Sequence, residues 1–294
     1  MIKINIKTAK VINFFIRPFH LCQLLFKKIF QYICLFCKIV CILLSKAKIR
    51  LIRSLEQKKY RVQHGLFVLE GDKAVREALD STLTVEYLLA KLAWLEQPSS
   101  TKANHIIEIN DQELSQISFL KTPNQAIALV QIPYYPLDFA ELTGGLSLYL
   151  DQIQDPGNLG TIIRIADWFG IRHVLCGQGC ADPFSPKTVQ STMGAIIRVK
   201  TNQTDVGFFR QLKIYQPDFP VFGAFLDGDN LYHTPLPTKA VMMMGNESKG
   251  ISEAVAQYVD QRLLIPSYSS GEPTSESLNV ATAAAIICAE FRRR

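Results

Sequence analysis

Apolar and polar positions alternate along the chain in blocks that predict two successive α/β units. The first unit, residues 46–132, opens with a basic segment in which Ile49, Ile52 and Leu55 recur at helical spacing. Short apolar runs and capping residues predict its further elements. In order these are helix 46–61, strand 66–69, a helix capped by Asp72 that runs to Leu79, strands 85–90 and 106–109, a helix capped by Asp111 that runs to Ile117, and strand 126–132. Alternating strands and short helices are typical of a small α/β domain.

Residues 133–145 form a turn-rich linker with Pro133-Tyr134-Tyr135-Pro136 and Gly144-Gly145. The second unit, residues 146–294, contains six apolar runs that predict strands. They are residues 146–150, 174–176, 196–199, 221–225, 240–244 and 262–265. Continuous apolar strands are typical of a parallel sheet that helices cover on both faces. We therefore predict a larger α/β domain with a parallel sheet.

Three polar segments follow strands of the second unit. They are residues 158–164 (Asn-Leu-Gly-Thr-Ile-Ile-Arg), residues 245–250 (Gly-Asn-Glu-Ser-Lys-Gly), and Ile265-Pro266 together with Ser277-Leu278-Asn279-Val280. Ligands of open parallel sheets bind beyond the carboxyl ends of the strands, so these segments are expected to converge on one ligand. The chain lacks the glycine patterns of a dinucleotide-binding turn and of a P-loop, which excludes those two nucleotide sites.

Each segment has a functional and a structural interpretation. Arg164, near the start of a helix predicted from Leu159, is placed to grip a phosphate with two donors, or else pairs with Asp151, Asp155 or Asp167. Backbone groups of the 245–250 loop suit the edge of an adenine, or the loop is a plain turn into a helix capped by Ser252. The alanine-rich helix predicted over residues 281–289 lets another helix pack closely, which indicates an interface between two copies of the chain.

Charge and cysteine are distributed unevenly. Residues 1–45 hold seven Lys and Arg and no Asp or Glu, and the rest of the chain holds 25 basic against 26 acidic residues. We interpret residues 1–45 as upstream sequence from a wrong start, with a membrane-surface anchor and a marginal spanning helix as alternatives. Cys34, Cys37 and Cys41 have no second pair at zinc spacing, so no metal site is expected. The scattered thiols of the chain fit a reducing cytoplasm.

The polar segments, in this order and at these strand ends, resemble the SpoU (TrmH-like) RNA ribose methyltransferases of the SPOUT superfamily. The matching residues are Asn158, Gly160 and Arg164, then Gly245-Asn246-Glu247 with Gly250, then Ile265-Pro266 with Ser277-Leu278-Asn279-Val280; Ser185-Pro186-Lys187 and Met193-Gly194-Ala195 resemble a further family segment. This resemblance covers about residues 146–294. Residues 46–132, with Phe67-Val68-Leu69-Glu70-Gly71, resemble the ribosomal-protein-like substrate-binding module often fused ahead of it.

The resemblance implies a SPOUT domain with a deep trefoil knot and transfer of a methyl group from S-adenosylmethionine to a ribose 2′-hydroxyl of structured RNA, either rRNA or tRNA. It implies a cytoplasmic homodimer joined through the C-terminal domain, and membrane binding is not expected. The cofactor residues it implies are Gly245, Asn246, Gly250, Ile265, Pro266 and Leu278. A long loop between Pro266 and Ser277, and Gln190 where the family often has a basic residue, leave the RNA target open.

The residues that the resemblance assigns to catalysis are Arg164, Asn158, Glu247, Ser277 and Asn279. The family gives the Arg164 position the task of removing the hydroxyl proton, but an arginine side chain stays protonated in proteins. We therefore expect Arg164 to bind the adjacent phosphate and orient the hydroxyl, with the other four positioning it. Alignment of hydroxyl, methyl and sulfur then supplies most of the acceleration. A catalytically silent RNA-binding protein of the same fold is the alternative.

Overall fold

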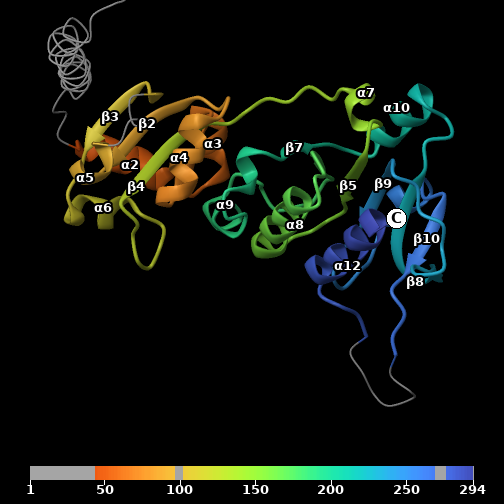
Figure 1. Ribbon diagram of the computed structural model, residues 1–294. Coiled ribbons are helices and arrows are strands. Elements are labelled where there is room, and N and C mark those ends of the chain that lie inside the picture. The colour runs from red at the N-terminus through yellow and green to blue at the C-terminus, as the bar shows by residue number, and fades with distance from the viewer. Residues whose placement is uncertain (1–43, 97–101, 269–275, 294) are drawn as a thin grey trace, which may run out of the picture.

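The computed structural model describes residues 44–96, 102–268 and 276–293, and it places one β-sheet in each unit (Figure 1). The elements of the first unit are α2 (Lys46–Ser54), α3 (Lys58–His64), β1 (Leu66–Glu70), α4 (Asp72–Asp80), β2 (Val85–Ala90), α5 (Leu92–Leu95), β3 (His105–Glu108), α6 (Asp111–Ile117) and β4 (Ala126–Gln131). Those of the second unit and its linker are α7 (Phe139–Leu142), β5 (Leu146–Leu150), α8 (Pro156–Trp168), β6 (His173–Cys176), α9 (Pro186–Ser191), a 3-10 turn (Ala195–Ile197), β7 (Lys200–Gln203), α10 (Gly207–Tyr215), β8 (Val221–Asn230), β9 (Ala240–Met244), α11 (Glu253–Ala256), β10 (Gln261–Leu264) and α12 (Val280–Arg293).

The sheet of the first unit has the order β1-β4-β2-β3. Strand β4 pairs antiparallel with β1 and β2, and β2 pairs parallel with β3. Helices α2 and α6 cover one face, where Ile52, Leu55 and Leu114 join the apolar side chains of the strands. Asn110, not Asp111, caps α6, and it forms a capping box with Glu113.

The single helix predicted over residues 46–61 is wrong, because the chain forms two helices there. Helix α2 ends at Ser54, and α3 starts at Lys58. The Arg61 guanidinium turns back and donates from Nη1 to the carbonyl oxygens of Leu55 and Glu56, at 2.6 and 2.7 Å. These carbonyls lie where a helix leaves its acceptors unpaired, so Arg61 satisfies the end of the first helix and stabilises the break.

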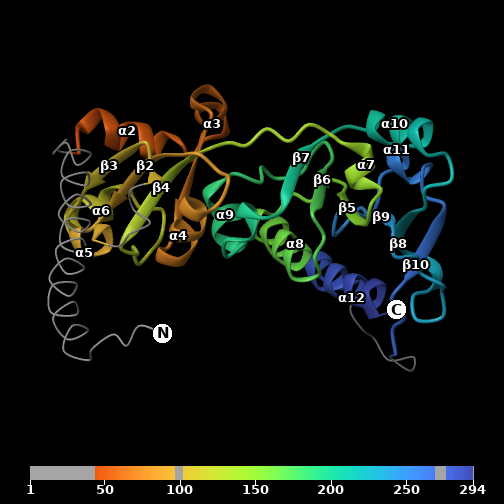
Figure 2. The same cartoon turned by 45° about the horizontal axis from the view of Figure 1, so that its top comes forward.

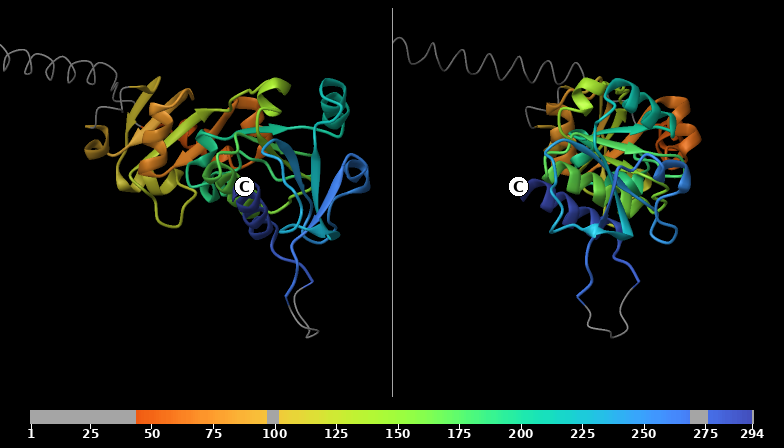
Figure 3. Two further views of the ribbon diagram at one scale, coloured as in Figure 1. Left: turned by 45° about the vertical axis from the view of Figure 1, so that its right-hand side comes forward. Right: turned by 90° about the vertical axis from the view of Figure 1, so that its right-hand side faces the viewer.

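The sheet of the second unit is parallel throughout the described strands, which confirms that prediction. Its order is β10-β8-β9-β5-β6-β7. Alternate residues of the central strands point to opposite faces, so Met242 and Met244 join the apolar cluster that contains α8 and α12, whereas Val241 and Met243 join the one that contains α10 and α11. The methionines are therefore core residues. In Figure 1 and in the left view of Figure 3, the first sheet and the β8–β10 edge lie at opposite ends of the molecule.

The strand predicted at residues 196–199 is also wrong. Gly194 adopts a left-handed φ of 92°, and the chain then makes a 3-10 turn through Ala195–Ile197. Ile196 and Val199 are buried without joining the sheet. Strand β7 instead uses the polar sequence Lys-Thr-Asn-Gln, because an edge strand pairs on one side only and needs no continuous apolar run.

Several predictions fall on residues that lie outside the described part of the chain. They include those for residues 1–43, with the cysteine run, and for residues 269–275. Within the described ranges, no helix combines the length and the apolar character needed to cross a membrane. The same ranges hold no group of three or more His, Cys, Asp or Glu side chains arranged to bind a metal ion.

Candidate active site at the carboxyl ends of β5, β9 and β10

Helix α8 follows the end of β5 and carries the first polar segment. The Asp155 side chain caps it by accepting a hydrogen bond from the Asn158 backbone N–H at 2.8 Å, and Pro156 occupies the first turn. This hydrogen bond lowers the pKa of the Asp155 carboxyl, which stays ionised beside the positive end of the helix dipole. The helix thus begins at Pro156 rather than Leu159, and Asn158 is held on its first turn.

The side chain of Asn158 joins all three polar segments. Its Nδ2 donates to Glu247 Oε1 at 2.6 Å, and its Oδ1 accepts from Asn279 Nδ2 at 3.0 Å. Asn279 Oδ1 in turn accepts from the backbone N–H groups of Ala281 and Thr282 at the start of α12. Because an ionised carboxylate only accepts, Glu247 fixes which way both amides point. We call Glu247, Asn158 and Asn279 the amide–carboxylate chain.

The loop from Gly245 to Gly250 is closed by its own backbone. The N–H and C=O groups of Asn246 and Gly250 bond to each other in both directions at 2.9 Å. A Cβ on Gly245 would lie 2.3 Å from the Gly250 carbonyl carbon, and Gly250 has a left-handed φ of 68°. Both glycines are therefore required for the loop to close.

The side chain of Asn246 forms hydrogen bonds to backbone groups of the protein itself. Its Oδ1 accepts from the backbone N–H groups of Ser248 and Lys249, and its Nδ2 donates 2.9 Å to the Gln152 carbonyl oxygen. Gln152 itself has a positive φ of 57°. Sequence reasoning missed Gln152, whose one signal is its place two residues after the end of β5. Asn246 therefore shapes the loop and ties it to the end of β5.

Three of the residues predicted to hold a cofactor have backbone groups without hydrogen-bond partners in the described part of the chain. Within the described residues, the backbone N–H and C=O groups of Gly245, Ile265 and Leu278 form no hydrogen bond. Ile265 and Pro266 are half-buried, and the Leu278 residue is 48% exposed. Unpaired backbone donors and acceptors next to partly exposed apolar side chains fit a ligand that has both hydrogen-bonding groups and apolar parts.

Arg164 is exposed on α8, six residues and about 9 Å along the helix from Asn158. Each aspartate proposed as its structural partner bonds elsewhere: Asp151 to the Ser252 N–H, Asp155 to Lys187, and Asp167 to Arg198. In the part of the chain that the structure describes, the Arg164 side chain forms no hydrogen bond or ion pair. Its guanidinium is therefore available to an external anion.

The structure thus brings Asn158, Glu247 and Asn279 together by direct hydrogen bonds, whereas Arg164 and Ser277 stay outside this chain. Ser277 is exposed. Gly160, matched as part of the first segment, faces α9: an added Cβ would lie 2.5 Å from both Ser191 Cβ and the Thr188 carbonyl oxygen. Its role is close packing of two helices rather than contact with a ligand.

Comparison with known proteins shows which family the chain resembles over both units. The model of the SpoU rRNA Methylase family matches residues 145–289, and that of the MRM3-like substrate binding domain matches residues 46–128. The chain is 31% identical over 247 residues to the 23S rRNA (guanosine(2553)-2′-O)-methyltransferase RlmP of Bacillus subtilis, covering 83% of this chain and 96% of the relative.

Two solved structures extend the likeness over both units. A TrmH-family protein from Porphyromonas gingivalis has a TM-score of 0.76 and 41% identity, covering 85% of this chain and 99% of that one. An AdoMet-bound rRNA methyltransferase from Sinorhizobium meliloti has a TM-score of 0.75 and 28% identity, covering 86% and 97%. Together with the three polar segments at the strand ends, these matches establish that the chain belongs to the SpoU rRNA methylase family.

Proposed function

We propose that this protein transfers a methyl group from S-adenosylmethionine to a ribose 2′-hydroxyl of structured ribosomal RNA. The observation that carries the proposal is the amide–carboxylate chain, which joins three polar segments that are distant in the sequence. A relative named as a 23S rRNA 2′-O-methyltransferase covers both units of the chain. A catalytically silent RNA-binding protein would not need this joined site, so we do not favour that alternative.

The cofactor would be held by the backbone groups around Gly245, Ile265 and Leu278, with Pro266 and the Leu278 side chain against its apolar parts. When bound, it supplies an electrophilic methyl group on a sulfonium. Asn246 and Gly250 act by fixing the loop that presents these groups.

Arg164 would bind the phosphate next to the target ribose, because its exposed guanidinium has donors free for a bidentate contact. Asn158, Glu247 and Asn279 would orient the hydroxyl, and Ser277 would complete that set from the loop before α12. These groups act by alignment. A hydroxyl oxygen held about 3 Å from the methyl carbon reacts faster, because the loss of translational and rotational freedom occurs on binding rather than in the reaction step.

We infer that the active unit is a homodimer formed through the second unit. The α8 surface exposes Trp168, which is 85% exposed, and α12, which runs beside α8, carries the partly exposed small residues Ala283 and Ala285. Ala281 and Ala284 are buried within this chain, so they serve the α8–α12 contact of one copy. Trp168→Glu is expected to shift the mass measured by light scattering from dimer to monomer; an unchanged mass would place the interface elsewhere.

Three further expectations remain proposals. The domain boundaries are 46–132 and 146–294, with the linker 133–145 between them. A deep trefoil knot encloses the cofactor residues. The protein works in the cytoplasm, which is consistent with the free thiols of Cys176, Cys180 and Cys288.

Replacement of Arg164 tests the proposed function. Arg164→Ala should abolish methyl transfer to in-vitro-transcribed 23S rRNA and leave the affinity for S-adenosylmethionine, measured by calorimetry, within about twofold, because Arg164 faces the RNA. Arg210→Ala removes another exposed arginine, on α10, and should keep full activity. Arg164→Ala activity within about tenfold of wild type would refute the assignment.

A further inference from the structure

We propose that Arg61 is a positioning residue for the methyl transfer, because it docks the first unit at a fixed place relative to helix α8. RNA bound by the first unit would then meet Arg164 in one geometry. The inference rests on the proposed function, and it concerns what sets the distance between the RNA-binding and catalytic parts. Three successive contacts carry it: Arg61 to Asp182, Asp182 to α9, and α9 to α8.

The first contact is a buried ion pair between the units. The Arg61 side chain is 3% exposed, and its Nε and Nη2 donate to Asp182 Oδ2 at 3.1 and 2.6 Å. Its Nη1 is satisfied by Leu55 and Glu56 within the first unit. A buried guanidinium is unfavourable unless its donors are paired, so the docked arrangement is the one in which Arg61 is fully satisfied.

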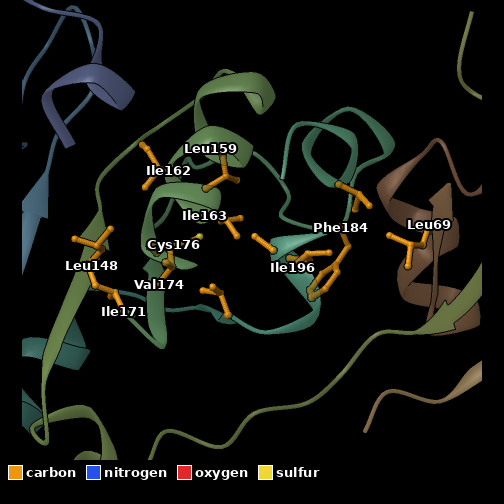
Figure 4. Close-up of a cluster of buried hydrophobic side chains, with 14 of the residues drawn as sticks. Leu69, Leu148, Leu159, Ile162, Ile163, Ile171, Val174, Cys176, Phe184 and Ile196 are labelled. Atoms are coloured by element: carbon orange, nitrogen blue, oxygen red, sulfur yellow. The ribbon is translucent and has the colours of Figure 1, made fainter. Parts of the chain in front are cut away.

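The second contact joins Asp182 to α9. Asp182 Oδ1 accepts from the Phe184 N–H at 2.9 Å, and Ser185 then caps α9. The Phe184 ring lies 5.1 Å from the ring of Phe67 in β1. Figure 4 shows Phe184 between Leu69 of the first unit and Ile196 of the second, within one apolar cluster that spans both units. The segment of Asp182 and α9 is therefore seated on the first unit.

The third contact joins α9 to the catalytic helix. Gly160 lets α8 approach α9 so closely that an added Cβ would lie 2.5 Å from α9 atoms. In Figure 2, α9 lies between α4 of the first unit and α8. Arg198 makes a second link, donating to Glu77 of α4 at 2.6 Å and to Asp167 of α8 at 2.8 Å. Arg198 is 45% exposed, so water weakens its pairs more than that of Arg61.

These contacts define how the loss of Arg61 should act. The Arg61 side chain is buried, so its loss leaves the exposed surface of the first unit and the cofactor residues of the second intact, and each unit should still bind its ligand. Release of the docked arrangement lowers the fraction of bound RNA whose ribose is aligned with α8, and alignment is the main source of rate in this mechanism. The chemical step should therefore slow while both affinities remain.

The test uses the full chain and in-vitro-transcribed 23S rRNA. Arg61→Ala should lower the single-turnover methylation rate at least tenfold, with the dissociation constants of the transcript and of S-adenosylmethionine within twofold of wild type. Spin labels on non-natural residues at exposed Gln112 of α6 and Gln211 of α10 should give a narrow distance distribution in the wild type and a broad one in Arg61→Ala. Asp182→Asn has only one side-chain oxygen, which can accept from Arg61 or from the Phe184 N–H but not from both. It should therefore lower the rate and broaden the distance distribution in the same direction as Arg61→Ala.

The matched control is Lys102→Ala, which removes one cation and one ion pair, with Asp80, inside the first unit. It should behave as wild type in both readouts. Rates within twofold of wild type in Arg61→Ala, a distance distribution that stays narrow, or an equal loss in Lys102→Ala would each overturn the proposal. Asp182→Ala replaces Arg61→Ala if the latter does not fold. If the wild-type protein methylates no RNA, the proposed function fails, while the distance measurement still decides the docking role of Arg61.

Discussion

Replacement of Gly160 by alanine tests the contact on which the position of α8 depends. The new Cβ would lie 2.5 Å from Ser191 Cβ and from the Thr188 carbonyl oxygen, so α8 and α9 must separate by about 1 Å to restore ordinary contact. Such overpacking costs about 1–3 kcal/mol, and alanine returns about 1 kcal/mol in helix propensity. We expect a net loss of up to about 2 kcal/mol in the free energy of unfolding.

The catalytic effect should be larger than the stability effect. A loss of up to about 2 kcal/mol lowers the melting temperature by at most roughly 8 °C in a protein of this size. A displacement of about 1 Å at Asn158 and Arg164 lowers the methylation rate by up to about 100-fold. Calorimetry and single-turnover methylation below the melting temperature measure the two quantities separately.

A control glycine and a relieving substitution make this prediction specific. Gly145→Ala meets no atom within 4 Å and should leave stability and rate unchanged or slightly raised. Ser191→Gly combined with Gly160→Ala removes one of the two colliding atoms and should recover part of both losses. Wild-type stability and rate in Gly160→Ala alone would refute the close-packing role.

Two further predictions concern charge. Asn158→Asp puts a second carboxylate beside Glu247 Oε1, to which the wild-type amide donates at 2.6 Å. The methylation rate of this variant, divided by that of wild type, should be very low at pH 8 and should rise toward pH 5.5 as the two carboxylates take up a shared proton. A ratio that does not change with pH would contradict the contact. Burial lowers the pKa of His173 against the opposing influence of Glu141, so the unfolded state binds a proton first as pH falls through about 6.5. The free energy of unfolding should therefore decrease below that pH, and His173→Gln should flatten this dependence in denaturant titrations; equal slopes for both proteins would contradict it.

The strands were predictable where apolar runs were bounded by turn residues, as for β4, β5 and β9. The strand predicted at residues 196–199 was wrong because a buried turn and a buried strand both appear in the sequence as a short apolar run. The break between α2 and α3 could not be predicted, since it depends on Arg61, which in sequence resembles one more cation on an exposed basic helix. A tertiary contact with Asp182, 121 residues away, decides its environment.

The candidate site was predictable as a set of strand ends, because parallel strands bring their carboxyl ends to one edge of the sheet. The hydrogen bonds within it were not, since Asn158 meets Glu247 and Asn279 at separations of 89 and 121 residues. The sequence alone also could not tell which of the family-matched glycines shape a loop and which serve helix packing. Gly245 and Gly250 close the second loop, whereas Gly160 serves helix packing.

The most direct test of the account is the chemical position of the transferred methyl group. Purified protein is incubated with tritiated S-adenosylmethionine and in-vitro-transcribed 23S rRNA, and the RNA is then hydrolysed with alkali, which does not cleave next to a 2′-O-methylated ribose. We predict that the label appears in an alkali-resistant dinucleotide and that Arg164→Ala removes it. Label confined to mononucleotides, which indicates base methylation, or no label at all, would contradict the account.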